Sequence, residues 1–252
     1  SSDFMERVDA ENINMLFHTN NEIYGKGWNF KIGAIVRPVD FLRLGLSFHT
    51  PSIYNFQEYF GSSMTSSFVN GTQYPYDPYT KSQLQDAKYT YRFVTPMRAI
   101  GSIGIIINKM ASIGIDAEYV DYSRMNFSRG NGSYAYTAEN TEISNKMKPV
   151  INVRAGGEVR LSSFYFRGGA GLYPSPSKDE LGYMSAMFTK SAGLGYRNSN
   201  FFLDFAFVNY SYTQKEYPYN VVEGVDPLVG KPDYISNKFN NNRFIVSVGF
   251  KF

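Results

Sequence analysis

The stretch Pro149–Leu161, which reads PVINVRAGGEVRL, decides the fold class. Apolar and polar residues alternate along it with a period of two. The apolar positions are Ile151, Val153, Ala155, Val159 and Leu161, and the polar positions between them are Asn152, Arg154, Glu158 and Arg160. Since successive side chains of a β-strand point to opposite faces, this pattern predicts a strand with one apolar and one charged face.

The same alternation recurs along most of the chain. It predicts strands at residues 27–37, 41–50, 89–107, 111–127, 164–173, 184–197, 201–212 and 243–252, and a weaker one at 13–19. Residues 89–107 keep one phase throughout, which predicts a single strand of roughly 60 Å at about 3.3 Å per residue. With about ten strands, an even number, the chain is predicted to be all-β, a transmembrane antiparallel β-barrel of the bacterial outer membrane.

Composition excludes several other classes of protein. Aromatic residues make up 17% of the 252 residues and charged residues 19%, and no apolar run approaches the length of about 20 that a transmembrane helix needs. The chain has no Cys and two His, His18 and His49, which argues against a metal site. A net charge of +3 is too evenly mixed to predict binding of nucleic acid.

The connections between predicted strands alternate in length. Short joints fall at residues 38–40, 108–109, 162–163 and 198–200, and long polar and aromatic loops fall at 58–85, 128–147, 174–183 and 214–242. Such sorting is typical of outer-membrane barrels, which have periplasmic turns and extracellular loops. It predicts a cell outer membrane protein of a Gram-negative bacterium with its C-terminus in the periplasm.

Charged residues gather on the predicted inner face of the strands. The candidate lumen residues are Arg98, Asp116, Glu118, Arg154, Glu158 and Arg167. A pair of carboxylates for acid–base hydrolysis is one reading. Charges of both signs on one face are more simply explained by ion pairs that keep a polar interior matched. We therefore expect no enzyme, no catalytic residue, no cofactor and no metal.

Glycines and prolines interrupt the strands at several points. The glycine runs at residues 156–157 and 168–171 lie inside predicted strands with no helix after them, so they fail the context test for a phosphate-binding loop. Pro51 and Pro96 each remove a ladder hydrogen bond. Such a break indicates either a lateral opening in the barrel wall or a bulge near its rim.

The C-terminal segment RFIVSVGFKF ends on Phe252 and resembles the signal that outer-membrane barrels present to their assembly machinery. Three further blocks are more specific: GWNFKIGAIVRPVDFLRLGLSFHTP, TPMRAIGSIGIIINKMASIGIDAEYVDYS and KSAGLGYRNSNFFLDFAFVNY. Their order and turn placement resemble the C-terminal part of the FadL/TodX family of long-chain fatty acid and hydrocarbon transporters, particularly its Bacteroidetes members. The resemblance covers nearly all of the chain from about Gly27.

That resemblance implies a family barrel of about fourteen strands with an N-terminal hatch, whereas this chain shows about ten strands and no counterpart of the hatch. Residues 1–252 are therefore expected to form a single β-barrel domain that is the C-terminal portion of a longer barrel, with a ten-stranded barrel as the alternative.

The implied function is passive uptake of hydrophobic small molecules, with capture by the loops at 58–85 and 214–242. The alternatives are a non-transporting anchor or shuttle in an envelope secretion complex, and a general porin. The expected partners are outer-membrane lipid, a hydrophobic ligand and, through Phe252, the barrel-assembly machinery.

Overall fold

Strand β11, Pro149–Leu161, begins and ends where the alternation predicts. In this computed structural model, which describes residues 2–10, 13–68, 73–76, 88–108, 110–130, 134–178, 184–216 and 234–250, it pairs antiparallel with β9 (Ala111–Asp121) and β12 (Phe164–Tyr173). The prediction of an all-β antiparallel protein is confirmed.

The chain divides into two compact units. Unit 1 contains Ser1–Asn29, Ser52–Thr95 and Met125–Asn140, and unit 2 contains Phe30–Pro51, Pro96–Arg124 and Thr141–Phe252. The prediction of one barrel domain over 1–252 stays a prediction.

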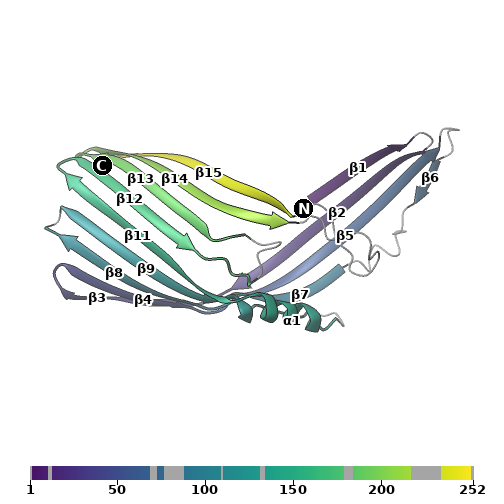
Figure 1. The fold of residues 1–252 in the computed structure, drawn as a ribbon, viewed down its shortest axis with the longest axis horizontal. Coiled ribbons are helices and arrows are strands. Elements are labelled where there is room, and N and C mark those ends of the chain that lie inside the picture. The colour runs from purple at the N-terminus through teal and green to yellow at the C-terminus, as the bar shows by residue number, and fades with distance from the viewer. Residues whose placement is uncertain are drawn as a thin grey trace. The chain divides into compact units, whose positions relative to one another are not determined.

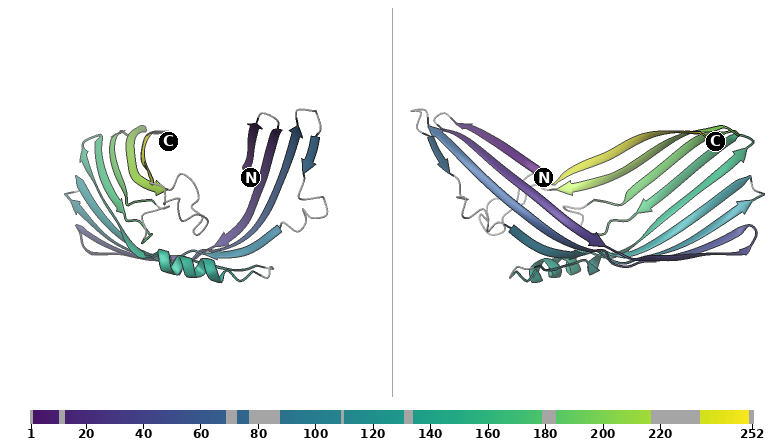
Figure 2. Two further views of the ribbon diagram at one scale, coloured as in Figure 1. Left: turned by 45° about the vertical axis from the view of Figure 1, so that its right-hand side comes forward. Right: turned by 180° about the vertical axis from the view of Figure 1, so that it is seen from behind.

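Unit 2 is built on a nine-stranded sheet in the order β15-β14-β13-β12-β11-β9-β8-β4-β3 (Figure 1). The strands not yet given are β3 (Lys31–Val39), β4 (Leu42–His49), β8 (Arg98–Ile107), β13 (Met187–Arg197), β14 (Phe201–Glu216) and β15 (Ile235–Phe250). All neighbouring strands pair antiparallel, and the sheet is visibly curved (Figure 2). This meander is the topology that a barrel wall requires.

Short turns join the strands of unit 2 at one end, as predicted. Asn108 and Ser162 occupy these turns with φ of 46° and 56°, in the left-handed region that tight hairpins use. In a third turn the Asn198 carboxamide oxygen accepts hydrogen bonds from the backbone N–H groups of Asn200 and Phe201, both at 2.8 Å. These local contacts fix the register of the hairpins.

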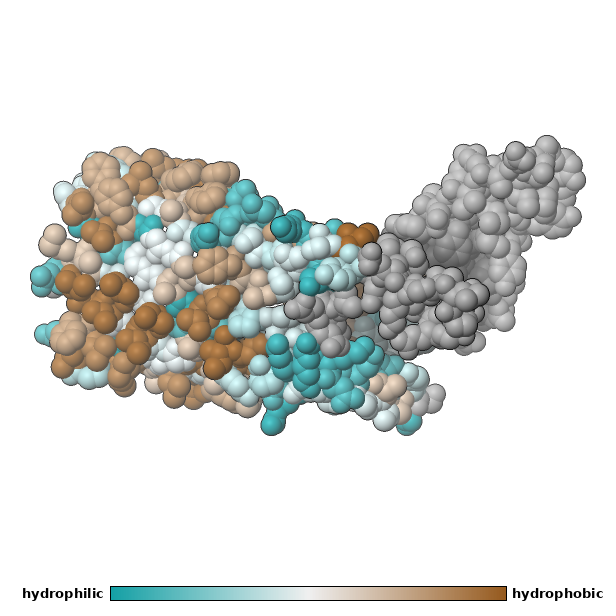
Figure 3. Space-filling model, in the orientation of Figure 1, coloured by the Kyte–Doolittle hydropathy of each residue, from teal (hydrophilic) through white to brown (hydrophobic). Residues whose placement is uncertain are grey.

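In this sheet, apolar side chains are exposed on one face and polar side chains are buried on the other, which is the reverse of the arrangement in a water-soluble protein. One face is apolar and exposed, with Leu46, Phe244, Val246 and Phe250 each 66–70% accessible. Among the described residues the buried hydrophobic side chains are Val120 and Val150, and both share the other face with buried Glu118 and Asn152. Figure 3 shows apolar side chains over unit 2 and polar ones over helix α1 (Thr137–Lys146). An apolar face of this size fits contact with lipid.

Unit 1 contains a six-stranded antiparallel sheet in the order β1-β2-β5-β7-β10, with β6 also paired to β5. Its strands are β1 (Ser2–Ala10), β2 (Ile13–Trp28), β5 (Ile53–Phe68), β6 (Gln73–Tyr76), β7 (Lys88–Val94) and β10 (Asn126–Arg129). The alternation missed β1, β5 and β6. The predicted loops at 58–85 and 214–242 are therefore partly strand, and residues 69–72, 77–87 and 217–233 lie outside the described residues.

The prediction of one strand over residues 89–107 is wrong. The chain leaves β7 at Val94 and begins β8 at Arg98, and the unit boundary falls between Thr95 and Pro96. Pro96 supplies the reason, because it has no N–H to continue the ladder. The predicted strand at 27–37 is divided in the same way, since β2 ends at Trp28 and β3 begins at Lys31.

Threonine side chains take over hydrogen bonding at these breaks. Within unit 2, Thr50 Oγ1 accepts from the Phe30 N–H at 2.9 Å. Within unit 1, Thr95 Oγ1 accepts from the Ser52 N–H at 3.0 Å. The backbone groups next to Pro51 and Pro96 therefore remain partnered, which explains how long barrel strands tolerate the interruption.

Candidate functional site

The polar face of the nine-stranded sheet carries the site that the sequence indicated. We call it the charged wall, and it consists of the six predicted residues Arg98, Asp116, Glu118, Arg154, Glu158 and Arg167 together with Arg160, Arg197 and Asp204. Directly opposite residues of an antiparallel pair share a face, and Asp116 stands opposite Arg154 just as Glu158 stands opposite Arg167. All six predicted residues lie in ion pairs.

Glu118 is the most deeply buried carboxylate of the wall, with 6% of the residue accessible. The Asn152 side-chain amide donates to Glu118 Oε1 at 2.8 Å, and Arg98 Nη1 lies 3.8 Å from the same oxygen. A buried carboxylate needs such partners because desolvation otherwise penalises its charge. The Glu118 carboxylate therefore has a structural role in the wall.

Arg167 joins two carboxylates from different strands. Its Nε donates to Glu158 Oε2 at 2.7 Å, and its Nη1 donates to Asp204 Oδ1 at 2.6 Å. Arg160 Nε donates to the other oxygen of Glu158 at 2.7 Å, and Arg197 Nη2 lies 3.3 Å from Asp204 Oδ2. The result is a chain of alternating charges across β11, β12, β13 and β14.

Tyr165 lies among the three arginines of this chain. The guanidinium carbons of Arg160, Arg167 and Arg197 lie 5.3, 5.6 and 4.7 Å from the centre of its ring. Cation–π contacts of this kind hold the cations close to one another. Gly195 completes the arrangement, since a Cβ there would stand 2.4 Å from Asp204 Oδ1 and would displace the carboxylate from Arg167.

The pair of Asp116 and Arg154 is looser, with Arg154 Nε 3.9 Å from Asp116 Oδ2. A cavity of about 540 Å³ opens beside it, and its lining includes Glu158, Arg167 and the glycines of β11 and β12. The glycine runs are thus paired strand segments, as the sequence indicated, and they leave space at the wall.

Sequence reasoning missed Asp204, Arg197 and Tyr165. Asp204 is the single charge in the otherwise apolar stretch FFLDFAFV of β14, and that isolation is the signal that could have identified it. Arg197 stands immediately before the turn at Asn198 and gave no such signal.

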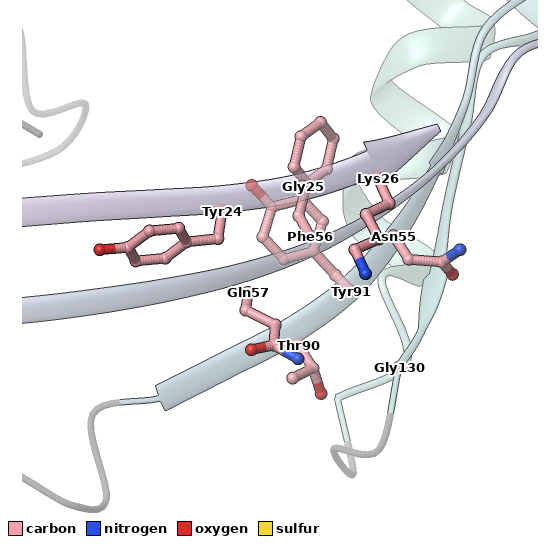
Figure 4. Close-up of a pocket in the computed structure, with 9 residues that line it drawn as sticks. All are labelled: Tyr24, Gly25, Lys26, Asn55, Phe56, Gln57, Thr90, Tyr91 and Gly130. Atoms are coloured by element: carbon pink, nitrogen blue, oxygen red, sulfur yellow. The ribbon is translucent and has the colours of Figure 1, made fainter. Parts of the chain in front are cut away.

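Unit 1 holds a second candidate region, a cavity of about 620 Å³ (Figure 4). Its lining residues are Tyr24, Gly25, Lys26, Asn55, Phe56, Gln57, Thr90, Tyr91 and Gly130. The rings of Phe56 and Tyr91 lie next to each other with centroids 5.4 Å apart. The two rings share one face of the sheet, and Lys26, Asn55 and Gln57 share the other, so the surface that a ligand would meet at the rings is aromatic.

A cluster of stacked and tilted rings extends from this cavity. Phe127 lies 4.7 Å from Phe93, 5.8 Å from Tyr136 and 6.0 Å from Tyr91, measured between centroids. Asn140 secures Phe127 by donating to its carbonyl and accepting from its N–H, both at 2.7 Å. Burial raises the pKa of the Tyr136 hydroxyl above its usual range.

Within the residues that the structure describes, no helix has both the length and the apolar character to cross a membrane. No group of three or more His, Cys, Asp or Glu side chains in the same residues is placed to hold a metal ion.

An exposed apolar face, a paired charged face and an antiparallel meander are the features of the wall of an outer-membrane β-barrel. The chain matches no protein-family model, and no curated protein matches it in sequence. Among solved structures, a Pseudomonas aeruginosa FadL homologue matches with a TM-score of 0.55 at 12% identity over 95% of this chain. The fold is FadL-like. The chain spans 64% of the length of that homologue.

Proposed function

We propose that the protein is an outer-membrane channel for passive uptake of hydrophobic small molecules such as fatty acids or hydrocarbons. The observation that carries the proposal is the FadL-like fold of the chain. The paired charges of the wall add support, because Arg167 bonded to both Glu158 and Asp204 offers little free charge to attract small ions.

Capture would begin at the aromatic cavity of unit 1. The rings of Phe56 and Tyr91, which share one face of the sheet, would contact the apolar part of a ligand. The loops at 58–85 and 214–242 are also proposed to take part in capture, although much of both lies outside the described residues. Phe252, also outside them, is proposed to engage the barrel-assembly machinery, with the C-terminus in the periplasm.

The direct test compares the native host with and without the full-length protein. Uptake of a radiolabelled long-chain fatty acid and of a hydrophilic disaccharide of similar mass is measured in both strains. We expect loss of the protein to lower fatty acid uptake and to leave disaccharide uptake unchanged.

The two alternatives give different results in this experiment. A general porin would lower disaccharide uptake, and an anchor or shuttle of a secretion complex would change neither rate. The anchor would instead copurify with other envelope proteins in stable stoichiometry. Either result would refute transport of hydrophobic molecules.

A further inference from the structure

Two neighbouring rows of side chains cross the apolar face of β13, β14 and β15 and differ in polarity. In the first row Ala192 stands opposite Phe207, and Phe207 stands opposite Phe244. The ring centroids of Phe207 and Phe244 lie 5.2 Å apart, and Phe244 is 67% accessible. On this face of β14 and β15 it is the last apolar row before the end of the sheet that carries the long connections.

The next row on the same face lies two residues nearer to that end on each strand, and it is polar throughout. Lys190 stands opposite Asn209, and Asn209 stands opposite Asn242. Asn240 and Lys238 follow on β15, since alternate residues of a strand share a face. We call these five residues the boundary patch.

Lys190 is an exception on the apolar face. Among the described residues on this face of β11, β12 and β13, it is the only one that carries a charge. Its side chain is exposed, and its Nζ lies 5.4 Å from the centre of the Phe188 ring. A lysine is costly against the middle of the hydrocarbon layer, and the cost falls close to zero at the membrane interface. The position of Lys190 therefore fits the level of the lipid head groups.

The three asparagines of the patch hold one another in place. Asn209 Nδ2 donates to Asn242 Oδ1 at 2.8 Å and also to Asn240 Oδ1. Asn240 and Asn242 are exposed, and with their oxygens turned to Asn209 their own amide N–H groups point away from it as donors. An ammonium group beside amide donors suits a ligand group that is anionic and only accepts hydrogen bonds.

We propose that the boundary patch binds the phosphorylated head group of an outer-leaflet lipid. A phosphate monoester carries negative charge and several acceptor oxygens, which match the Lys190 ammonium group and the amide donors of Asn240 and Asn242. Lys238, two positions from Asn240, adds a second cation on the same face.

The apolar row explains why the ligand is a lipid and not a soluble phosphate. It adjoins the patch on the same three strands, so a molecule whose phosphate binds Lys190 lays its acyl chains over Phe207 and Phe244. Long loops of outer-membrane barrels are extracellular, which assigns this end of the sheet to the outer leaflet. The inference rests on the contact of this face with lipid and is independent of what the protein transports.

Native mass spectrometry of the full-length protein in neutral detergent tests the proposal. The probes are phosphorylated lipid A, the same lipid without its phosphates, and soluble glucosamine 1-phosphate. We expect saturable retention of phosphorylated lipid A and at least about fivefold weaker retention of the dephosphorylated form. Equal retention of the two lipids would overturn the proposal, because the phosphate would not be recognised. Binding of glucosamine 1-phosphate as tight as that of lipid A would also overturn it, because the acyl chains would not contribute.

Variants locate the site. Lys190→Ala should weaken retention of phosphorylated lipid A about fivefold, and Asn240→Ala/Asn242→Ala should weaken it as well. The matched control is Lys31→Ala, which removes the same charge from the opposite face of the sheet, the face of Arg98, and should stay within about twofold of the wild type. Lys190→Arg keeps the charge and should keep most of the binding. Gel mobility without heating shows that each variant is folded, and equal losses in Lys190→Ala and Lys31→Ala would overturn the assignment.

Discussion

Arg167 stands directly opposite Glu158 in the β11–β12 ladder, and its Nε donates to Glu158 Oε2 at 2.7 Å. The same guanidinium also donates to Asp204 on β14, two strands away from Arg167 itself. One side chain thus partners carboxylates from β11 and β14 across β12 and β13. It is the residue on which the charge balance of this part of the wall depends.

Replacing Arg167 with Leu should destabilise the folded protein by about 1–3 kcal/mol, because Glu158 and Asp204 lose their shared partner and are only 18% accessible. Arg160→Leu provides the control. Arg160 binds the same Glu158 but is 53% accessible, so its removal should cost clearly less than the removal of Arg167. Urea unfolding in lipid vesicles measures both. Equal losses in the two variants would show that Arg167 has no special place in the network.

A second prediction follows from the proposed contact of the apolar face with lipid. Val246 and Ser247 are neighbours on β15 and point to opposite faces of the sheet. Val246→Arg should destabilise the protein in a bilayer by about 2–4 kcal/mol, because it places a charge against hydrocarbon. Ser247→Arg should be tolerated, since residue 247 pairs with Asp204 in the ladder.

The folded fraction of each of these two variants is read from its mobility on gels run without heating. Vesicles of increasing acyl chain length give a further check, because a lipid-facing charge becomes more costly in a thicker bilayer. If Ser247→Arg fails and Val246→Arg folds normally, the assignment of the two faces is reversed.

Strand breaks support a third prediction. Thr50→Val and Thr95→Val remove the hydroxyls that accept from the Phe30 and Ser52 N–H groups. Each change should cost about 1–3 kcal/mol and speed hydrogen exchange at the amide that loses its acceptor. Thr50→Ser and Thr95→Ser keep the hydroxyl and should leave exchange slow. Unchanged exchange in the valine variants would contradict the role of the two hydroxyls.

Local pattern and non-local register explain what the sequence could and could not predict. Pro149–Leu161 was predicted with its observed bounds because period-two alternation is a property of the segment itself. Residues 89–107 misled because the alternation continues in phase through Thr95 and Met97 while Pro96 interrupts the ladder. The alternation in the sequence predicts the face of the sheet on which each side chain lies. It does not show whether the backbone hydrogen bonds between strands continue.

In the candidate site, too, the sequence predicts what depends on a single strand and does not predict what depends on the pairing of strands. The six lumen residues could be named because each is a charge on the polar phase of its own strand. Their partners could not all be named, since the contact of Arg167 with Asp204 depends on the registers of β12 with β13 and of β13 with β14. Arg197 and Tyr165 join the network through the same non-local pairing.

The aromatic cavity of unit 1 supports the last prediction. Phe56→Ala and Tyr91→Ala remove two neighbouring rings that line it, and each should weaken binding of a fluorescent long-chain fatty acid by about tenfold, or about 1.4 kcal/mol. Lys26→Gln changes a side chain on the opposite face of the sheet and should leave the binding of the fatty acid and of an alkane of the same length unchanged.

The matched control for the ring removals is Phe239→Ala, which deletes an exposed ring of β15 in unit 2 and should leave both affinities unchanged. Competition titrations in detergent give the affinities of all four variants. Normal binding by both Phe56→Ala and Tyr91→Ala would remove this cavity from the uptake route. Weaker binding by Lys26→Gln would show that the polar face of this sheet also takes part in binding.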